Sequence, residues 1–292
     1  NYYTLSEAIS KATDGQTVKL LVDSSDDVIL SADETRSITL DLNGKNITGT
    51  LGVSENGTGT LTLSDTNLEV KMTKGKINLS SSAIKLLENV TGAITVNKSL
   101  SLDLNGKKLT GTTDGNLITV STKGDLTVMD SASGGQIINE NATGSAVQNN
   151  GTFNLKSGEI LSLFYGINNI AAGSQSKIFG GLIRANTAIR MLAGNLNVLA
   201  GKVRGLGTTR LNEILDITTQ QVENVIEPAA ITDASSQGIG IDVSGGSKDV
   251  NVTVGGDEDG NKTDSFDAAL TVNGCRKAAS FVKFCDAFDI PV

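Results

Sequence analysis

Apolar and polar residues alternate over short segments of this chain, and turn-forming residues separate the segments. In the sequence SITLDL, Ile38, Leu40 and Leu42 alternate with polar residues. This period of two is typical of a β-strand with one buried face. Asn43-Gly44 follows directly, and because both residues tolerate positive φ, the sequence predicts that the chain turns a corner after the strand.

The same pattern is repeated at intervals that indicate stacked coils. SITLDLNGKNITGT at 37–50 returns as SLSLDLNGKKLTGT at 99–112, and a looser rung begins at Gly124, Gly151, Ser174 and Gly194, with spacings of 27, 23 and 20 residues. A repeat of this length, with short strands and Gly corners, is typical of a solenoid. We therefore expect both LDLNGK copies on the same side of the coil, with their leucines in one core and their aspartates outward: Leu40, Leu42, Leu102 and Leu104 inside, Asp41 and Asp103 outside.

The ends and one interior stretch of the ladder have a different pattern. Thr4 begins a capping box, and the apolar spacing that follows predicts a helix over 5–13 that covers the first coil. Residues 206–237 form an insert, and the alternating pattern resumes in 238–256. Insertions into a solenoid lie on one face and often bind partners, which makes this insert a functional candidate; an ordinary tolerated loop is the alternative.

Composition narrows the possible partners. The 292 residues include 33 Gly, 2 Pro, no Trp and no His, and the net charge is -8 with a pI near 4.7. The basic residues form no block, so we expect neither a nucleic acid nor an anionic membrane surface as a partner. The chain has no apolar run of membrane-spanning length, and NYYTLSEAIS lacks a signal-like pattern, so we expect no transmembrane segment and an export signal already removed.

The residues available for catalysis are few. A chain without His excludes a Ser-His-Asp triad, a Cys-His pair and His-ligated zinc. Asp65 and Asp130 stand at rung ends, where Asp commonly caps a turn, and a catalytic role is the alternative. Asp41 and Asp103 are expected to lie about 14 Å apart, too far for a glycosidase pair. No arginine lies beside an aspartate cluster in the sequence; the arginines are Arg36, Arg184, Arg190, Arg204, Arg210 and Arg276.

The sequence gives little support for a metal site or a reactive thiol. Residues 257–261, DEDGN, lack the spacing of an EF-hand loop and are expected to be a solvated loop. Cys275 and Cys285 point in different directions on a predicted helix, so we interpret them as packing residues rather than a disulfide. The sequence thus predicts no catalytic, cofactor-binding or metal-binding residue and leaves the ligand-binding residues open.

Residues 4–256 resemble the right-handed parallel β-helix repeats of large exported proteins from anaerobic gut bacteria. The resemblance is carried by AISKATDGQTVKLLVD, by the two LDLNGK copies and by the GTFNLKSGEI type of rung. It implies an all-β, right-handed, single-stranded parallel β-helix used as an adhesive, scaffold or carbohydrate-associated surface module. Polysaccharide lyases and hydrolases share this fold.

The last stretch, DSFDAALTVNGCRKAASFVKFCDAFDIPV at 264–292, resembles part of the carboxyltransferase subunit of biotin-dependent acyl-CoA carboxylases and decarboxylases. The resemblance implies a short helix leading into a strand at IPV. The rest of such an acyl-CoA site is absent, so no catalytic residue is transferred. Two interpretations stay open: an amphipathic helix that caps the solenoid, or a fused foreign fragment.

The sequence therefore favours a non-catalytic scaffold or adhesive module, secreted or held at a bacterial cell surface, without a cofactor. Its partner is expected to be a glycan or a host or cell-wall surface. The alternatives are a carbohydrate-active β-helix enzyme and a truncated relative of acyl-CoA carboxyltransferases. The domain hypothesis is a β-helix over 1–256 followed by a helical tail over 264–292.

Overall fold

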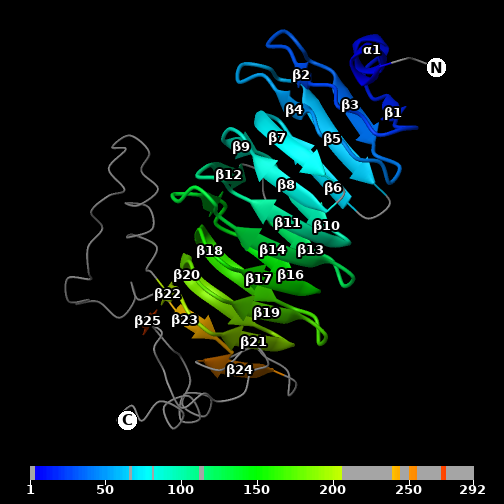
Figure 1. Cartoon of the computed structure of the whole chain (residues 1–292). Coiled ribbons are helices and arrows are strands. Elements are labelled where there is room, and N and C mark those ends of the chain that lie inside the picture. Colours follow the sequence, from blue (N-terminus) through cyan, green and yellow to red (C-terminus); the bar gives the residue numbers. More distant parts are fainter. Residues whose placement is uncertain are drawn as a thin grey trace, which may run out of the picture.

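The computed structural model describes residues 4–65, 68–80, 82–111, 115–205, 239–243, 250–254 and 271–273. In this part of the chain the strands stack into a parallel β-solenoid of about eight turns, as predicted (Figure 1). The first sheet contains β1 (Thr17–Lys19), β3 (Ser37–Asp41), β5 (Thr60–Asp65), β6 (Leu68–Met72), β9 (Val90–Thr91), β10 (Ile94–Val96), β12 (Lys108–Gly111), β13 (Ile118–Val120), β15 (Gln136–Asn139), β16 (Ser145–Asn149), β18 (Glu159–Asn169), β20 (Leu182–Met191), β22 (Lys202–Gly205), β23 (Ile239–Asp242) and β25 (Thr271–Asn273). The second sheet contains β2 (Val28–Leu30), β4 (Thr50–Val53), β7 (Gly75–Ser80), β8 (Ala83–Leu86), β11 (Ser99–Asp103), β14 (Asp125–Met129), β17 (Thr152–Leu155), β19 (Gln175–Ile178), β21 (Asn195–Val198) and β24 (Asn251–Val254).

Each complete coil passes through three sides. From β11 in the second sheet the chain enters β12, then β13 in the first sheet, and returns to the second sheet at β14, winding in a right-handed sense (Figure 1). Lower in the solenoid, β18 and β20 are long enough to cover two sides each, so β18 pairs with both β15 and β16. The bend in β18 lies between Ser162 and Tyr165, where the register against β20 shifts.

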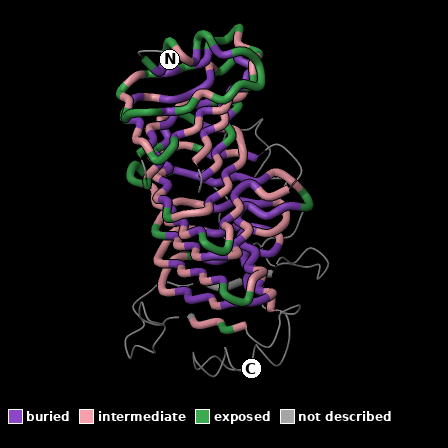
Figure 2. The backbone as a smooth tube through the Cα atoms, turned by 90° about the vertical axis from the view of Figure 1, so that its right-hand side faces the viewer, coloured by how far each residue is buried: buried purple, intermediate pink, exposed green. Residues whose placement is uncertain are grey.

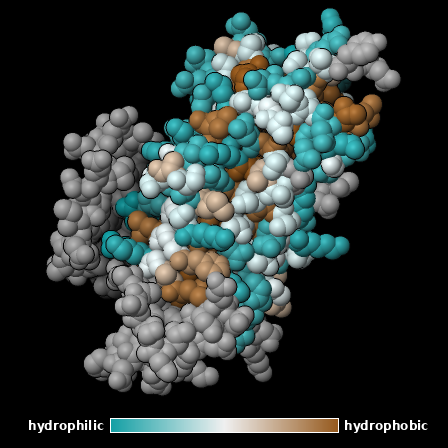
Figure 3. Space-filling view, viewed as in Figure 1, coloured by the Kyte–Doolittle hydropathy of each residue, from teal (hydrophilic) through white to brown (hydrophobic). Residues whose placement is uncertain are grey.

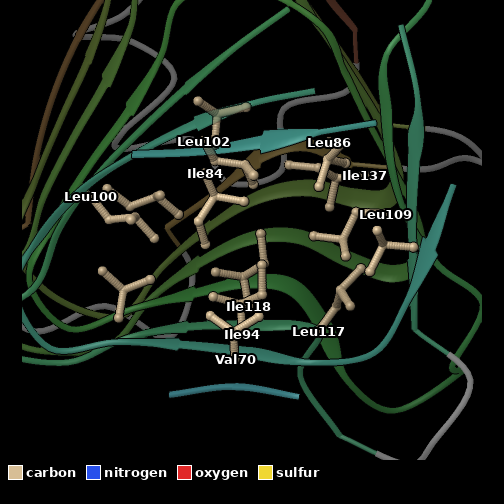
Figure 4. Packing of buried hydrophobic residues seen from close by; sticks show 14 of the residues in the cluster. Val70, Ile84, Leu86, Ile94, Leu100, Leu102, Leu109, Leu117, Ile118 and Ile137 are labelled. Carbon is tan, nitrogen blue, oxygen red and sulfur yellow. The ribbon is translucent and has the colours of Figure 1, made fainter. Parts of the chain in front are cut away.

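The interior of the solenoid is one continuous apolar core. The four leucines of the LDLNGK copies are among its members, and none is more than 2% exposed, which confirms the alternation seen in the sequence. Figure 4 shows Leu102 of β11 beside Ile84 of the neighbouring strand β8, with Leu100 and Leu86 in the same cluster. Along the backbone, buried positions alternate with partly exposed ones (Figure 2), as expected for strands with one face inward.

The residues Asp-Leu-Asn-Gly occur twice in the sequence, and each time they form the same hydrogen-bonded corner. Asp41 accepts the backbone N–H of Asn43 at 2.9 Å, and the amide of Asn43 donates to the carbonyl of Leu20 in the preceding coil at 3.0 Å. Asn43 has a φ of 49°, in the left-handed region predicted from the Asn-Gly sequence. The second copy repeats both bonds: Asp103 accepts the N–H of Asn105, and the Asn105 amide donates to the carbonyl of Leu86.

The prediction that both copies lie on the same side of the coil is wrong. The first copy forms β3 of the first sheet, whereas the second forms β11 of the second sheet. The difference arises at a double hairpin, because β6 runs antiparallel to β5 and β10, and β7 runs antiparallel to β4 and β8. The chain retraces part of a coil and then resumes its original direction, and the Asn105-Gly106 corner lies one side of the solenoid away from the position of Asn43-Gly44.

A helix covers the N-terminal end, as predicted, although it is shorter than the expected 5–13. Helix α1 spans Leu5–Lys11, and the Thr4 side chain accepts the N–H of Glu7. Asp26 from the first coil accepts the N–H of Leu5 at 2.7 Å. At the other end, the guanidinium of Arg36 donates to the carbonyl of Ala12 and pairs with Glu34. The cap is therefore attached to the coils through the Asp26 carboxylate, the Arg36 guanidinium and a bond from the Ser6 hydroxyl to the carbonyl of Asp27.

The Glu34–Arg36 pair predicts a dependence of stability on pH. Hydrogen bonding from the Arg36 side chain is the largest cause that lowers the pKa of Glu34 from 4.5 to about 2, and it outweighs the opposing effect of burial. Because the folded-state pKa is the lower one, this stabilisation is complete above pH 4.5 and is lost as the pH falls towards 2.

We expect the stability difference between the wild type and Glu34→Gln to shrink between pH 4.5 and pH 2, as measured by urea unfolding at a series of pH values. Glu55→Gln removes the same charge from an exposed loop position and serves as the control. A difference for Glu34→Gln that stays constant over this range would contradict the role given to the pair.

After the insert, the solenoid resumes as the sequence indicated. β23 pairs with β20, and β24 pairs with β21, while Ile241 is buried in the core. The predicted insert at 206–237 lies outside the described residues. In the stretch interpreted as a tail, only Thr271–Asn273 is described; it forms β25 and pairs with β22 of the first sheet. The predicted C-terminal helix falls outside the described residues.

Candidate functional site

Asp130, one of the two aspartates considered for catalysis, holds neighbouring coils together. Its two carboxylate oxygens accept the backbone N–H groups of Gly106 and Gly135, each at 2.7 Å. Its own N–H donates to the hydroxyl of Ser157 in the next coil at 2.8 Å. Asp130 therefore joins three successive corners, two through its carboxylate and the third through its backbone N–H, and the carboxylate has the turn-capping role that the sequence also allowed.

Asp103 has the same kind of role one coil earlier. Its carboxylate accepts the N–H groups of Asn105 and Ser131 and the hydroxyl of Ser131 at 2.8–3.0 Å. Partial burial acts to raise the pKa of Asp103, but the bonds from Ser131 and Asn105 and the nearby charge of Lys85 outweigh it and lower this pKa below its usual value. Asp103 thus remains a carboxylate that accepts hydrogen bonds, and Asp41, on the other sheet, is not its partner.

Asp65 forms an ion pair across the double hairpin. Its carboxylate lies 3.1 Å from the ammonium of Lys98, and its side chain is 8% exposed. Asp65 ends β5 and Lys98 precedes β11, so the pair spans the reversed strand β6 between them. This placement gives Asp65 a structural partner.

The described ranges hold no group of three or more acidic, Cys or His residues placed to bind a metal ion. The sequence candidates for metal or thiol chemistry, residues 257–261 with Cys275 and Cys285, lie outside those ranges. Nor does the described part of the chain contain a helix long and apolar enough to cross a bilayer.

The outer face of the second sheet carries rows of polar side chains, and Figure 3 shows hydrophilic and intermediate residues there, interspersed with hydrophobic ones. Two rows of outward side chains run across β11, β14, β17, β19, β21 and β24, and their register places each residue directly beside the next. Amide and hydroxyl groups dominate both rows. The first row is Ser99, Asp125, Thr152, Gln175, Asn195 and Asn251; the second is Ser101, Thr127, Asn154, Lys177, Asn197 and Thr253.

A second surface of different character lies on the outside of the first sheet. Over β18, β20, β22 and β23 the described residues carry four cationic side chains and two carboxylates, on a chain whose net charge is -8. We call this the basic surface; it comprises Tyr165, Arg184, Arg190, Lys202 and Arg204, with Glu159 and Asp242 as its carboxylates. It is the one described region that combines several arginines with an aromatic side chain.

Contacts within the basic surface fix several of these side chains. Arg184 pairs with Glu159 through both Nε and Nη2, and Glu159 also accepts a bond of 2.8 Å from Gln136. Arg190 places its guanidinium carbon 4.8 Å from the centre of the Tyr165 ring, a cation–π geometry. Phe164 lies against the same ring, with centroids 3.9 Å apart.

Sequence reasoning missed this surface because it looked for an arginine beside an aspartate along the chain. Arg184 and Arg204 are twenty residues apart, and the structure makes them direct neighbours in the register of β20 and β22. Twenty is also the spacing of the rungs that begin at Ser174 and Gly194, so that period was the signal that could have paired the arginines. Arg190 is adjacent in the same way to Asn168 on β18.

Comparison with known proteins adds no functional assignment. No protein-family model matches the chain, and neither the curated proteins nor the solved structures include a significant match.

Proposed function

We propose that this chain is a non-catalytic binding module, a rigid solenoid whose outer faces contact a glycan. One observation carries the proposal: Asp65 and Asp130, the aspartates for which the sequence left a catalytic role open, are bound to other parts of the solenoid, Asp65 to Lys98 and Asp130 to backbone N–H groups. Both carboxylate oxygens of Asp130 accept N–H groups, and Asp103 accepts three hydrogen bonds. Removing either carboxylate is therefore expected to weaken the fold.

Glycosidic-bond cleavage needs two carboxyl groups that face one substrate at a separation of several ångströms. Asp41 and Asp103, the pair repeated in the sequence, lie in different sheets. Asp65 is paired with Lys98 across the double hairpin. The carboxylates considered from the sequence thus lie at different places in the solenoid and bond to other parts of it. This arrangement favours a binding function over catalysis.

The polar rows of the second sheet suit a ligand rich in hydroxyl groups. Strands in a sheet are about 4.8 Å apart, so amide and hydroxyl groups recur at that interval along the solenoid axis. Neighbouring groups in the rows already bond to one another; the amide of Asn154 donates to Asp125, and that of Asn251 donates to Asn195. Such a surface is fixed before a ligand arrives, which lowers the entropy cost of binding.

The proposal includes display at a bacterial surface, and this part rests on the resemblance of residues 4–256 to exported repeat proteins. Secretion of the full-length gene product by its source cell tests it. The resemblance of residues 264–292 to a carboxyltransferase supports no function here, since most of that stretch lies outside the described residues.

A binding panel tests the proposed function. Purified protein is immobilised, and neutral and acidic glycans of defined structure are passed over it. We expect saturable binding of at least one glycan class. A panel that gives no saturable binding would contradict the choice of a glycan as the ligand, and binding to a purified cell-wall or host protein would then identify a different ligand class.

A further inference from the structure

We propose that the basic surface binds a glycan that carries carboxylate or sulfate groups. The inference rests on the proposed binding function and names its ligand class. Its starting point is a local charge opposite in sign to that of the chain: four cations against two carboxylates over β18, β20, β22 and β23. Such a patch on an acidic protein attracts anions to one place and leaves the other faces repulsive to them.

The arginines of this surface differ in how their charge is balanced. Arg184 is paired with Glu159 and is 8% exposed. Arg190 and Arg204 form no ion pair with a carboxylate in the described part of the chain, and the guanidinium of Arg190 contacts only the face of Tyr165 among the aromatic rings there. A planar guanidinium that forms no ion pair is suited to a carboxylate or a sulfate, each of which accepts two parallel N–H bonds.

Unsatisfied polar atoms provide a second, independent observation. Three buried side-chain atoms of the described residues lack a hydrogen-bond partner, and two belong to this part of the first sheet: Nε of Arg204 and Oδ1 of Asn168. Asn168 is 8% exposed and is the register neighbour of Arg190. A buried polar atom without a partner costs about 1–3 kcal/mol, so polar groups of this kind need an explanation in a native protein. An anionic, hydroxyl-bearing ligand that reorients the Arg190 and Arg204 side chains would supply both an acceptor and a donor.

The neighbouring side chains favour a glycan as the source of the anion. Tyr165 is partly exposed and provides a ring edge with a polar tip, which suits a sugar that is apolar on its faces and polar at its rim. Gln148, Asn168, Arg190 and Asp242 follow one another in register, so Arg190 has an amide residue on one side and a carboxylate residue on the other. Amides next to cations match a polymer that presents hydroxyl and anionic groups together.

The test uses three polymers that share one backbone: dextran, carboxymethyl-dextran and dextran sulfate. Equilibrium binding to the full-length wild type is compared with that of a double variant, Arg190→Gln with Arg204→Gln. The control is Lys123→Gln with Lys156→Gln, which removes the same charge from two exposed positions outside the basic surface. Thermal unfolding of all three proteins establishes that each is folded.

We expect the wild type and the lysine control to bind at least one anionic polymer, with affinity falling as salt is added, and to bind dextran weakly or not at all. The arginine variant should bind that polymer at least about tenfold more weakly while unfolding at the wild-type temperature. Preference between the two anionic polymers then identifies carboxylate or sulfate as the recognised group.

Equal losses in the arginine and lysine variants would show non-specific attraction and overturn the inference. So would binding of dextran that is unaffected by the arginine substitutions, although glycan binding itself would then stand. If none of the three polymers binds while the wider panel yields a neutral glycan, this inference fails and the proposed function survives. If the panel is also negative, both fail.

Discussion

Replacing Leu102 with alanine is expected to lower the free energy of unfolding by about 2–5 kcal/mol, the range for removing a fully buried leucine from a close-packed core. Leu102 is 0% exposed and lies on β11, whose neighbours β8 and β14 pack Ile84 and Val128 at the same register. The coils above and below are held by strand pairing, so they cannot collapse freely into the cavity. Urea or thermal unfolding of the purified variant measures the loss.

Ser101→Ala is the matched control for that experiment, because Ser101 is the adjacent residue of β11 and faces outward. Its effect should stay within about 0.5 kcal/mol. A loss below about 1 kcal/mol for Leu102→Ala would show that this position is not part of a tightly packed core.

Replacing Asn149 with alanine is expected to destabilise the protein by about 2–6 kcal/mol, because at least two buried groups lose a hydrogen bond to this side chain, at a cost of about 1–3 kcal/mol each. Asn149 is 0% exposed at the end of β16. Its Oδ1 accepts the N–H of Gly151 at 3.0 Å, and its Nδ2 donates to the carbonyl of Gln175 at 2.8 Å. The same amide bonds to Asn169 and Ser176, so one side chain joins strands of both sheets inside the solenoid.

Asn154→Ala provides the comparison for Asn149. Asn154 is also an asparagine that bonds to a neighbouring coil, but it lies on the outer face of β17, where water can replace its bonds to Asp125 and Thr127. Its loss should cost no more than about 1 kcal/mol. If the two variants unfold at the same denaturant concentration, the buried network does not have the importance given to it here.

The sequence predicted the local structure of this protein better than its winding. Alternation located the strands, and the Asn-Gly pairs located corners with positive φ, because both features depend on residues adjacent along the chain. The double hairpin was missed because LEVKM in β6 and GKINLS in β7 alternate like any other strand of the ladder. Alternation shows which face is buried but not whether a strand runs parallel or antiparallel to its neighbour.

The basic surface could not be predicted from local sequence patterns either, because it depends on the register between neighbouring strands. Arg184 and Arg204 become neighbours only when the coils between them have a fixed length, and Arg190 meets Tyr165 only because β18 and β20 both bend between two sides of the solenoid. The roles of Asp103 and Asp130 also depend on the adjacent coil, although the position of Asp130 at a rung end correctly indicated turn capping. Partners that are distant along the chain cannot be identified from the pattern of neighbouring residues.

The proposal that the module binds without chemistry is tested most directly by recovering a glycan after contact with the protein. Each ligand found in the binding panel, and the two anionic dextrans, are incubated with excess protein, and the polymer length and the number of reducing and unsaturated ends are then measured. The account predicts recovery of intact polymer with no new ends. Shortened chains or new ends that disappear in Asp65→Asn or Asp130→Asn variants that remain folded would contradict it and establish an enzyme.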